Sequence, residues 1–198
     1  MMEKDTREKL IDVAVKLFAA KGFDGTSIND IAAELDITKQ ALLHHFRRKE
    51  KLYGEVLERI FAHSGAVVEK AVADADGPVA QFRAALDAMY QSMMADTDRS
   101  QVLLRELLDN QHRAPDARSW YFQPLLNRFL QLARAARPDL DLPDGVIIAF
   151  VYQNISAGHY FAVSLPTLQG VLSPGDFADM QGAYPQELNR QIDYFMSL

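Results

Sequence analysis

The sequence predicts an all-α protein with a small helix-turn-helix domain followed by a larger helical domain. Apolar residues recur at three- and four-residue spacing along nearly the whole chain, and no segment shows the strict alternation of a strand. Capping residues and tight turns divide the first fifty residues into three helices. Prolines divide the remainder into longer helices, which makes about nine in all.

The composition is that of a globular protein. The chain has 198 residues, of which 48% are hydrophobic and 24% charged, so it can bury a substantial core. It has no cysteine, which excludes disulfides and thiolate metal sites and favours a reducing compartment. The charged first ten residues do not resemble a signal peptide, and no apolar run reaches the roughly 18 residues of a membrane span. We therefore expect a cytoplasmic protein without a membrane partner.

The charge is distributed unevenly. The formal net charge is -6, yet residues 1–53 carry ten Lys or Arg against nine Asp or Glu. Residues 38–51 contain five basic residues and only Glu50 as an acid, a local balance of +4. Such a patch can bind phosphates, while the acidic remainder of the chain discourages nonspecific adhesion.

Three helices are expected in the first part of the chain. The first spans about 5–21 and ends at Gly22, where a left-handed residue can close it. The second covers about 27–34, with Ser27 and Asp30 as a capping box. Thr38 can cap the third helix, and Asp36 occupies a turn position that needs a left-handed conformation. Two short helices joined by so tight a turn can place the second one in the major groove of DNA.

The remaining helices follow from periodicity and from the positions of the prolines. A long helix over about 49–72 connects the two parts of the chain. Further helices are predicted over 79–95, 99–111, 116–136, 144–165 and 185–197. Pro115, Pro138, Pro143, Pro166 and Pro185 are among the residues expected to separate them.

Residues 6–53 resemble the DNA-binding domain of the TetR family of repressors. The resemblance is carried by Gly22-Phe23, by the stretch from Thr26 to Ala32, by Ile37-Thr38-Lys39, by His45-Phe46 and by the stretch from Lys49 to Tyr53. Three positions depart from the family pattern: Asp36 stands where Gly is usual, Gln40 where Gly or a small residue is frequent, and Leu43 where a phosphate-binding Tyr is common. The resemblance implies a DNA-binding domain over 1–48 and a helical ligand-binding and dimerisation domain over 49–198.

Eight residues are candidates for contact with double-stranded operator DNA. Lys39 and Gln40 lie on the first turn of the third helix, where their long donors can reach base edges. Thr26, Ser27 and Thr38 lie at helix N-termini, which favour phosphate oxygens. The family resemblance adds Lys49 and the position of Leu43 as phosphate contacts, and His44 is a further candidate.

The last two predicted helices are candidates for a homodimer interface. The helix from Asp144 carries the small residues Ala149, Ala157, Gly158 and Ala162, and the terminal helix offers Leu188, Ile192 and Phe195. Together they can form a four-helix interface across a twofold axis, as the family resemblance also implies. Ordinary packing within one chain is the alternative.

A pocket for an apolar or aromatic effector is expected among the middle helices. The candidate wall residues are Tyr90, Met94, Trp120, Tyr121 and Tyr152. Polar anchors could come from Gln111, His112, Asn154 and His159, and neither a metal nor a cofactor is expected. Most aromatic residues of this region are expected to belong to the core.

The predicted function is that of a ligand-responsive transcriptional regulator, with repression favoured over activation. The usual motifs of hydrolases, P-loop proteins, dinucleotide-binding enzymes and zinc proteases do not occur, so no enzymatic activity is expected. A ligand carrier or protein-interaction module is the alternative, because acidic helical domains also store lipids or bind partners. That alternative leaves Lys39 and the basic cluster from Arg47 to Lys51 without a role.

Overall fold

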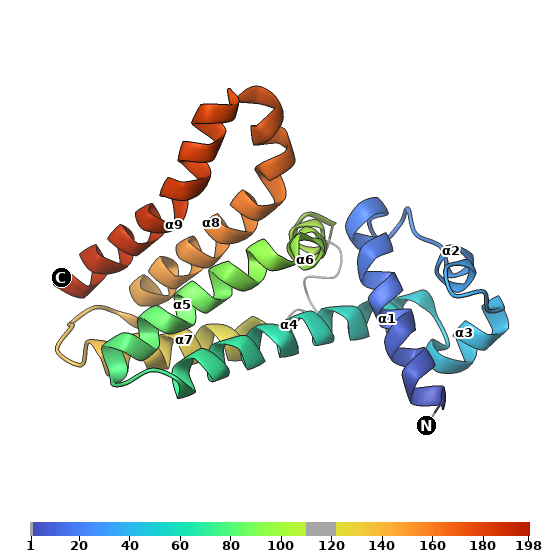
Figure 1. Ribbon diagram of the computed structural model, residues 1–198. Helices are drawn as coiled ribbons and strands as arrows, with labels where there is room; N and C mark the ends of the chain where they lie inside the picture. Colours follow the sequence, from blue (N-terminus) through green and yellow to red (C-terminus); the bar gives the residue numbers. More distant parts are fainter. Residues whose placement is uncertain (1, 110–121) are drawn as a thin grey trace. The chain divides into compact units, whose positions relative to one another are not determined.

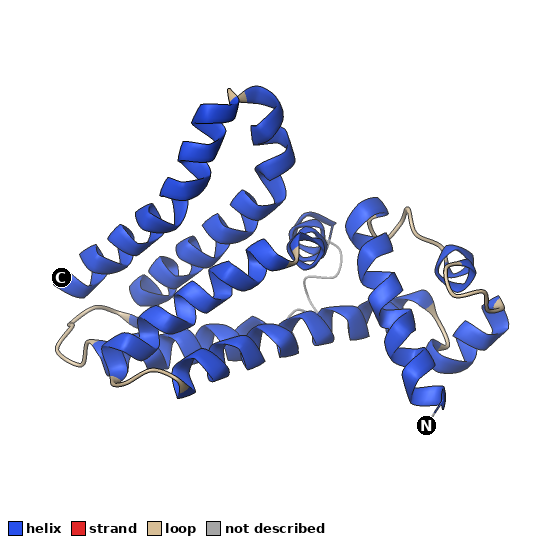
Figure 2. Cartoon of the chain, in the orientation of Figure 1, coloured by secondary structure: helices blue, strands red, loops and turns tan. Residues whose placement is uncertain are grey.

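The computed structural model describes residues 2–109 and 122–198, and all regular structure in these two ranges is helical (Figure 2). Figure 1 labels the nine described helices along the chain. They are α1 (Met2–Lys21), α2 (Ile28–Ala33), α3 (Lys39–Phe46), α4 (Lys49–Ala73), α5 (Pro78–Ala95), α6 (Thr97–Asp109), α7 (Phe122–Ala136), α8 (Asp144–Val171) and α9 (Pro174–Ser197). The all-α fold class predicted from the sequence is confirmed.

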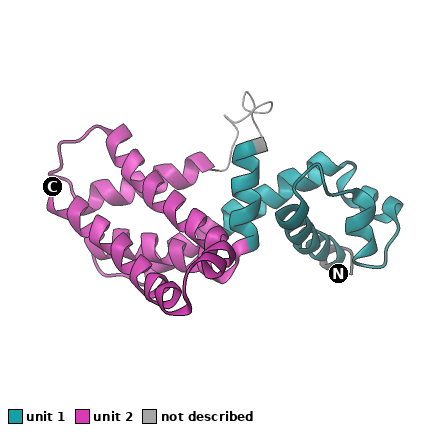
Figure 3. Ribbon diagram, turned by 90° about the horizontal axis from the view of Figure 1, so that it is seen from above, with its two compact units in different colours: residues 1–63, 98–121 teal, residues 64–97, 122–198 magenta. Residues whose placement is uncertain are grey.

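The chain forms two compact units, coloured separately in Figure 3. Unit 1 contains residues 1–63 and 98–121, and unit 2 contains residues 64–97 and 122–198. The grouping by contacts therefore differs from the expected division at residue 48, because the first part of α4 and all of α6 but Thr97 belong to unit 1. The functional division at residue 48 stays a prediction.

Unit 1 is built on a core shared by α1–α3, the start of α4 and α6. Leu10, Phe18, Leu42 and Phe46 are completely or almost completely buried. Val102 brings α6 into the same core, and the Arg105 guanidinium donates hydrogen bonds to the carbonyls of Ala19 and Ala20 at 2.9 and 3.1 Å. These carbonyls lie near the C-terminal end of α1, where helix carbonyls lack partners within the helix, so a cation from α6 stabilises that end.

Unit 2 is a bundle in which α5, α7 and α8 pack against one another and α9 adds a further layer. Phe82 and Phe129 are fully buried, and Phe195 of α9 stacks on Phe150 of α8 with ring centroids 4.4 Å apart. α8 is long and apolar enough to cross a membrane by length and composition alone. Its inner face packs in this core, and a buried core helix meets the same criteria.

The predicted start of α8 and end of α9 are confirmed, but the predicted end of α8 at 165 and start of α9 at 185 are wrong. α8 continues through Pro166 to Val171, and α9 begins at Pro174 and contains Pro185 inside it. Ser173 caps α9 by accepting a hydrogen bond from the Asp176 N–H at 3.2 Å, and Pro174 occupies the first turn, where a missing N–H costs nothing. An S-x-x-D cap followed by proline was therefore present in the sequence, and the prolines inside the pattern obscured it.

Candidate nucleic-acid interface

The turn between α2 and α3 is built from local hydrogen bonds. The Ser27 hydroxyl accepts from the Asp30 N–H at 3.1 Å, and the Ser27 N–H donates to the Asp30 carboxylate at 2.9 Å. This donation from the Ser27 backbone, with the Ser27 side chain, holds the pKa of Asp30 below its usual value. The Thr38 hydroxyl accepts from the Ala41 N–H at 3.2 Å. Both predicted caps thus fix where the two helices begin.

Asp36 adopts the left-handed conformation expected at this turn, with φ of 52°. Its N–H donates to the carbonyl of Ala33, and the next N–H, of Ile37, donates to the carbonyl of Ala32. The chain therefore reverses within a few residues after α2. Leu42 and Phe46 are then buried on the inner face of α3, which leaves its other face for solvent.

The outer face of α3 collects four of the predicted contact residues. Lys39, Gln40 and His44 are exposed and Leu43 is half-buried. Their spacing of one, three and one residues places them within an arc of about 140° around the helix, beside the face that buries Leu42 and Phe46. Ser27 and Thr38 are also exposed at the N-termini of α2 and α3. The arrangement offers long donors on a protruding helix face and hydroxyls at helix ends.

Thr26 and Lys49 form hydrogen bonds within unit 1, where Thr26 is buried and Lys49 half-buried. Thr26 is only 1% exposed, and its hydroxyl donates to the carbonyls of Gly22 and Leu17 at 2.8 and 3.1 Å. The Lys49 ammonium donates to the carbonyls of Phe23 and Thr26 at 2.8 and 3.1 Å and lies 4.1 Å from the centroid of the Phe23 ring. These two side chains connect the segment between α1 and α2 to the start of α4.

Exposed basic residues adjoin this face. Arg47 and Arg48 follow α3 directly and are exposed, and Lys51 is exposed at the start of α4. Arg47 has a φ of 58°, a conformation that non-glycine residues adopt rarely and that the sequence did not predict. The N–H of Arg47 donates to the carbonyl of Leu43 at 2.8 Å and so closes α3.

Comparison with known proteins shows what this part of the chain is similar to. Residues 10–56 match the model of the bacterial regulatory proteins of the tetR family. A 55-residue segment is 40% identical to IcaR of Staphylococcus epidermidis, an HTH-type negative transcriptional regulator of the biofilm operon icaADBC. This N-terminal segment is therefore similar to the tetR family. The matched segment is 28% of this chain and 30% of that relative, so the comparison spans less than a third of the relative's length.

Solved structures extend the likeness from this segment to the whole fold. A TetR-family regulator from a Rhodococcus species superposes with a TM-score of 0.71 at 16% identity, covering 99% of this chain and all of that one. The ketosteroid transcriptional regulator KstR2 of Mycobacterium tuberculosis gives a TM-score of 0.64 at 18% identity over 93% of each chain. The likeness at this identity concerns the fold.

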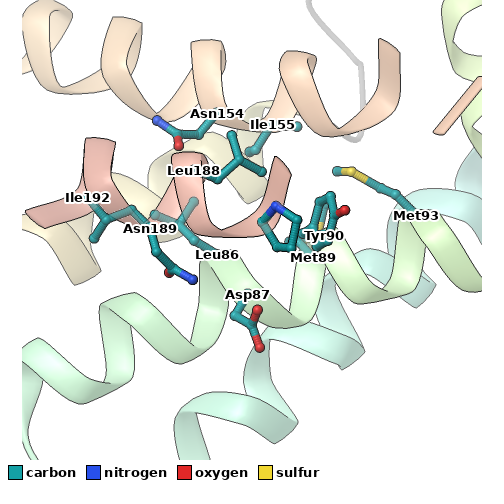
Figure 4. Close-up of a pocket in the computed structure, with 11 residues that line it drawn as sticks. Leu86, Asp87, Met89, Tyr90, Met93, Asn154, Ile155, Leu188, Asn189 and Ile192 are labelled. Carbon is teal, nitrogen blue, oxygen red and sulfur yellow. The ribbon is translucent and has the colours of Figure 1, made fainter. Parts of the chain in front are cut away.

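The structure also has a pocket in unit 2, between α5, α8 and α9 (Figure 4). Of the five predicted wall residues, Tyr90 lines it. Met93 lines the pocket in place of Met94, which packs at the edge of the core. Leu86, Met89, Tyr90 and Met93 recur at helical spacing on one side of α5, a periodicity that the sequence contained.

Tyr152 does not line this pocket. It is 45% exposed, and its ring meets Phe122 edge-on with centroids 6.3 Å apart. Tyr152 and Asn154 are two residues apart on α8, about 200° around the helix, so only one of them can face inward.

The other predicted pocket residues and anchors, Trp120, Tyr121, Gln111 and His112, lie outside the described residues. Within the described part of the chain, no three His, Asp or Glu side chains gather as a metal site would require.

The residues expected to form the dimer interface mostly pack within the chain. Ile192 and Phe195 of α9 are buried in the core of unit 2, as is Ala162 of α8. Gly158 faces α5, where an added Cβ would lie 2.8 Å from the Met93 sulfur. The alternative of packing within one chain therefore applies to these four residues. Several other apolar side chains of α8 and α9 are exposed, and so is the residue after α9: Val146, Tyr152, Tyr160, Val171, Tyr194 and Leu198.

Proposed function

We propose that this chain is a transcriptional repressor that binds palindromic operator DNA as a homodimer and releases it when a small molecule binds to unit 2. The observation that carries the proposal is the outer face of α3, where Lys39, Gln40 and His44 project from a helix fixed by caps and a left-handed turn. An exposed helix face of this kind can enter the major groove and present donors to base edges.

The phosphate contacts belong to a different set of side chains from those that read bases. Ser27 and Thr38 at the helix ends, with Arg47 and Arg48 after α3, are exposed and supply hydroxyl and guanidinium donors. They fix the position of the protein on the duplex. Thr26 and Lys49 are left out of this set, because their polar groups already bind carbonyls within unit 1.

The homodimer is supported by the exposed apolar residues of α8 and α9. Tyr160, Val171 and Tyr194 are 71%, 70% and 67% exposed, and a second copy covering these helices would remove such apolar side chains from water. A second copy would cover the same residues in both chains, which is what twofold symmetry requires. Two recognition helices related in this way would bind two half-sites of a palindrome, about 34 Å apart.

Repression is the favoured direction because a 55-residue segment of the chain is similar to part of a negative transcriptional regulator. The ligand response is supported by the pocket in unit 2. A ligand that prefers one arrangement of the dimer shifts the population away from the arrangement that binds DNA.

The decisive experiment is selection of bound duplexes from a random DNA pool, with the wild type and with Lys39→Ala/Gln40→Ala. We expect the wild type to enrich a palindrome and the double variant to lose it. Lys16→Ala is the matched control, because it removes the same charge from an exposed position on α1. A ligand carrier without a DNA-binding role would enrich no sequence in any of the three proteins, and that result would refute the proposal.

A further inference from the structure

The pocket between α5, α8 and α9 has an apolar wall and one buried polar side chain. Its empty space is ≈ 390 Å³, including the mouth that opens to solvent. Leu, Ile and Met side chains form most of the wall, and Asp87 and Asn189 lie at exposed positions. Asn154 of α8 is the polar residue inside, with only 6% of its surface exposed. All the lining residues belong to unit 2.

The carboxamide of Asn154 uses only one of its two ends within the described chain. Its Nδ2 donates to the carbonyl of Phe150, one turn earlier on α8, at 2.9 Å. This bond fixes which end is the amide nitrogen. The other end, Oδ1, is buried and has no hydrogen-bond partner among the described residues. Figure 4 shows the oxygen on the side of the pocket that faces Leu188, with the nitrogen turned away.

A buried acceptor without a partner needs an explanation. Leaving such a group unpaired costs about 1–3 kcal/mol, and most buried polar atoms in proteins are paired. An apolar residue of similar shape, such as Leu, would avoid this cost at the same position. An acceptor at the wall of a pocket is suited to a donor that arrives with a ligand.

The aromatic side of the pocket is rigid and uncharged. Tyr90 lines the pocket and stacks on Tyr184, which in turn stacks on Phe161 with ring centroids 3.7 Å apart. The Tyr184 hydroxyl donates to the carbonyl of Ala157 at 2.8 Å, which joins α9 to α8. Burial raises the pKa of both Tyr90 and Tyr184, so both phenols stay neutral near pH 7. Nothing in this inner wall would neutralise a buried ligand charge.

We propose that this pocket binds a compact, uncharged, mainly apolar molecule through one hydroxyl or N–H group, which donates a hydrogen bond to Oδ1 of Asn154. Phenols and small alcohols belong to this class. The Tyr90 ring and the Met89 and Met93 side chains would contact the apolar part of the molecule. An anion is disfavoured because Asn154 presents an acceptor and Asp87 a carboxylate near the mouth.

The position of the pocket connects such a ligand to the proposed function. Two of its three walls are α8 and α9, the helices that carry the exposed surface proposed to form the homodimer. A ligand between them and α5 would change how the two helices are spaced. The link to DNA release depends on the proposed function, whereas binding of the ligand itself does not.

Calorimetric titration of the full chain with phenol and with anisole tests the proposal. The two probes share a ring, but the methyl ether lacks the donor. We expect phenol to bind the wild type about tenfold more tightly, as one hydrogen bond to a buried acceptor allows. Asn154→Leu keeps the shape and removes the acceptor, so we expect both probes to bind that variant with similar affinity. Asn127→Leu, at an exposed position on α7, is the matched control and should keep the preference for phenol.

Several results would overturn the proposal. Equal affinity of phenol and anisole for the wild type would show that Oδ1 does not select a donor, as would a preference that survives in Asn154→Leu. Failure of phenol to bind the wild type at millimolar concentration would count equally against it. If Asn154→Leu does not fold, Asn154→Ala provides the same comparison. Because none of these titrations contains DNA, their failure is distinct from a failure to select a palindrome.

Discussion

Lys49 illustrates how a residue that matches a family motif can also have a structural role. Family resemblance makes it a phosphate contact, yet its ammonium binds the carbonyls of Phe23 and Thr26 and lies over the Phe23 ring. A charged donor shared between two carbonyls at a half-buried position stabilises the segment between α1 and α2. A substitution of Lys49 should therefore change the stability of the fold more than it changes the affinity for DNA.

Lys49→Gln should therefore lower the free energy of unfolding by about 1–2 kcal/mol, because two charge-assisted hydrogen bonds are lost. Chemical denaturation measures this change. Lys51→Gln is the control, since Lys51 is exposed and its ion pair with Glu55 is 3.7 Å long, so we expect about 0.5 kcal/mol or less. If Lys49 also contacts a phosphate, DNA binding by Lys49→Gln should depend less steeply on salt concentration, because about one counterion fewer is released on binding.

His159 on α8 should make the protein sensitive to acid. Burial lowers its pKa from 6.5 to about 4, so the folded chain binds fewer protons than the unfolded chain between these values. Stability should therefore fall as the pH is lowered through this window. The ring is only partly buried, so we expect the contribution to be on the order of 2 kcal/mol.

His159→Gln should remove this part of the acid sensitivity. Denaturation curves at pH 7.5 should differ little between the wild type and the variant, and the wild type should lose stability faster between pH 6.5 and 4. Parallel loss of stability in the two proteins over that range would show that His159 does not carry the effect.

At the scale of elements, the turn between α2 and α3 contains a residue in a costly conformation. Asp36 has a φ of 52°, which Gly adopts without strain. We expect Asp36→Gly to raise the free energy of unfolding by up to about 1 kcal/mol and Asp36→Ala to lower it by a similar amount, as measured by denaturation. Glu34→Gly is the control, because Glu34 has a φ of -63° and gains nothing from Gly. Stabilisation by glycine at both positions would contradict this account.

The elements also show where sequence patterns are sufficient. The starts of α2 and α3 were predicted within one residue. Ser27 and Thr38 cap them through hydrogen bonds to the N–H group three residues further along the chain. The end of α8 and the start of α9 were not predicted correctly, because a proline ends a helix only where neighbouring packing does not support it. Tyr184, next to Pro185, stacks on Phe161 and donates to the carbonyl of Ala157, and these contacts join residues that are distant in sequence.

At the scale of the whole molecule, the proposed homodimer makes a prediction about mass. Sedimentation of the wild type should give about twice the chain mass of 22.3 kDa. Tyr160→Glu/Tyr194→Glu places charges in the exposed surface of α8 and α9 and should shift the protein toward the monomer. Val79→Glu, at a 43% exposed position on α5, should leave the mass unchanged. A wild type that sediments as a monomer at all concentrations would refute the dimer.

The sequence by itself determined the all-α class, the helix-turn-helix and the face of α3 that carries Lys39, Gln40 and His44. These depend on caps, turns and helical periodicity, which act over a few residues and can be recognised without knowing the rest of the fold. Only the tertiary structure decided that α6 packs with α1, that Lys49 and Thr26 form hydrogen bonds within unit 1, that Tyr152 faces out and that Asn154 faces a pocket with an unpaired oxygen. The physical reason is that burial and hydrogen-bond pairing depend on neighbours far away in the chain, and periodicity shows that a helix has an inner face without showing what lies against it.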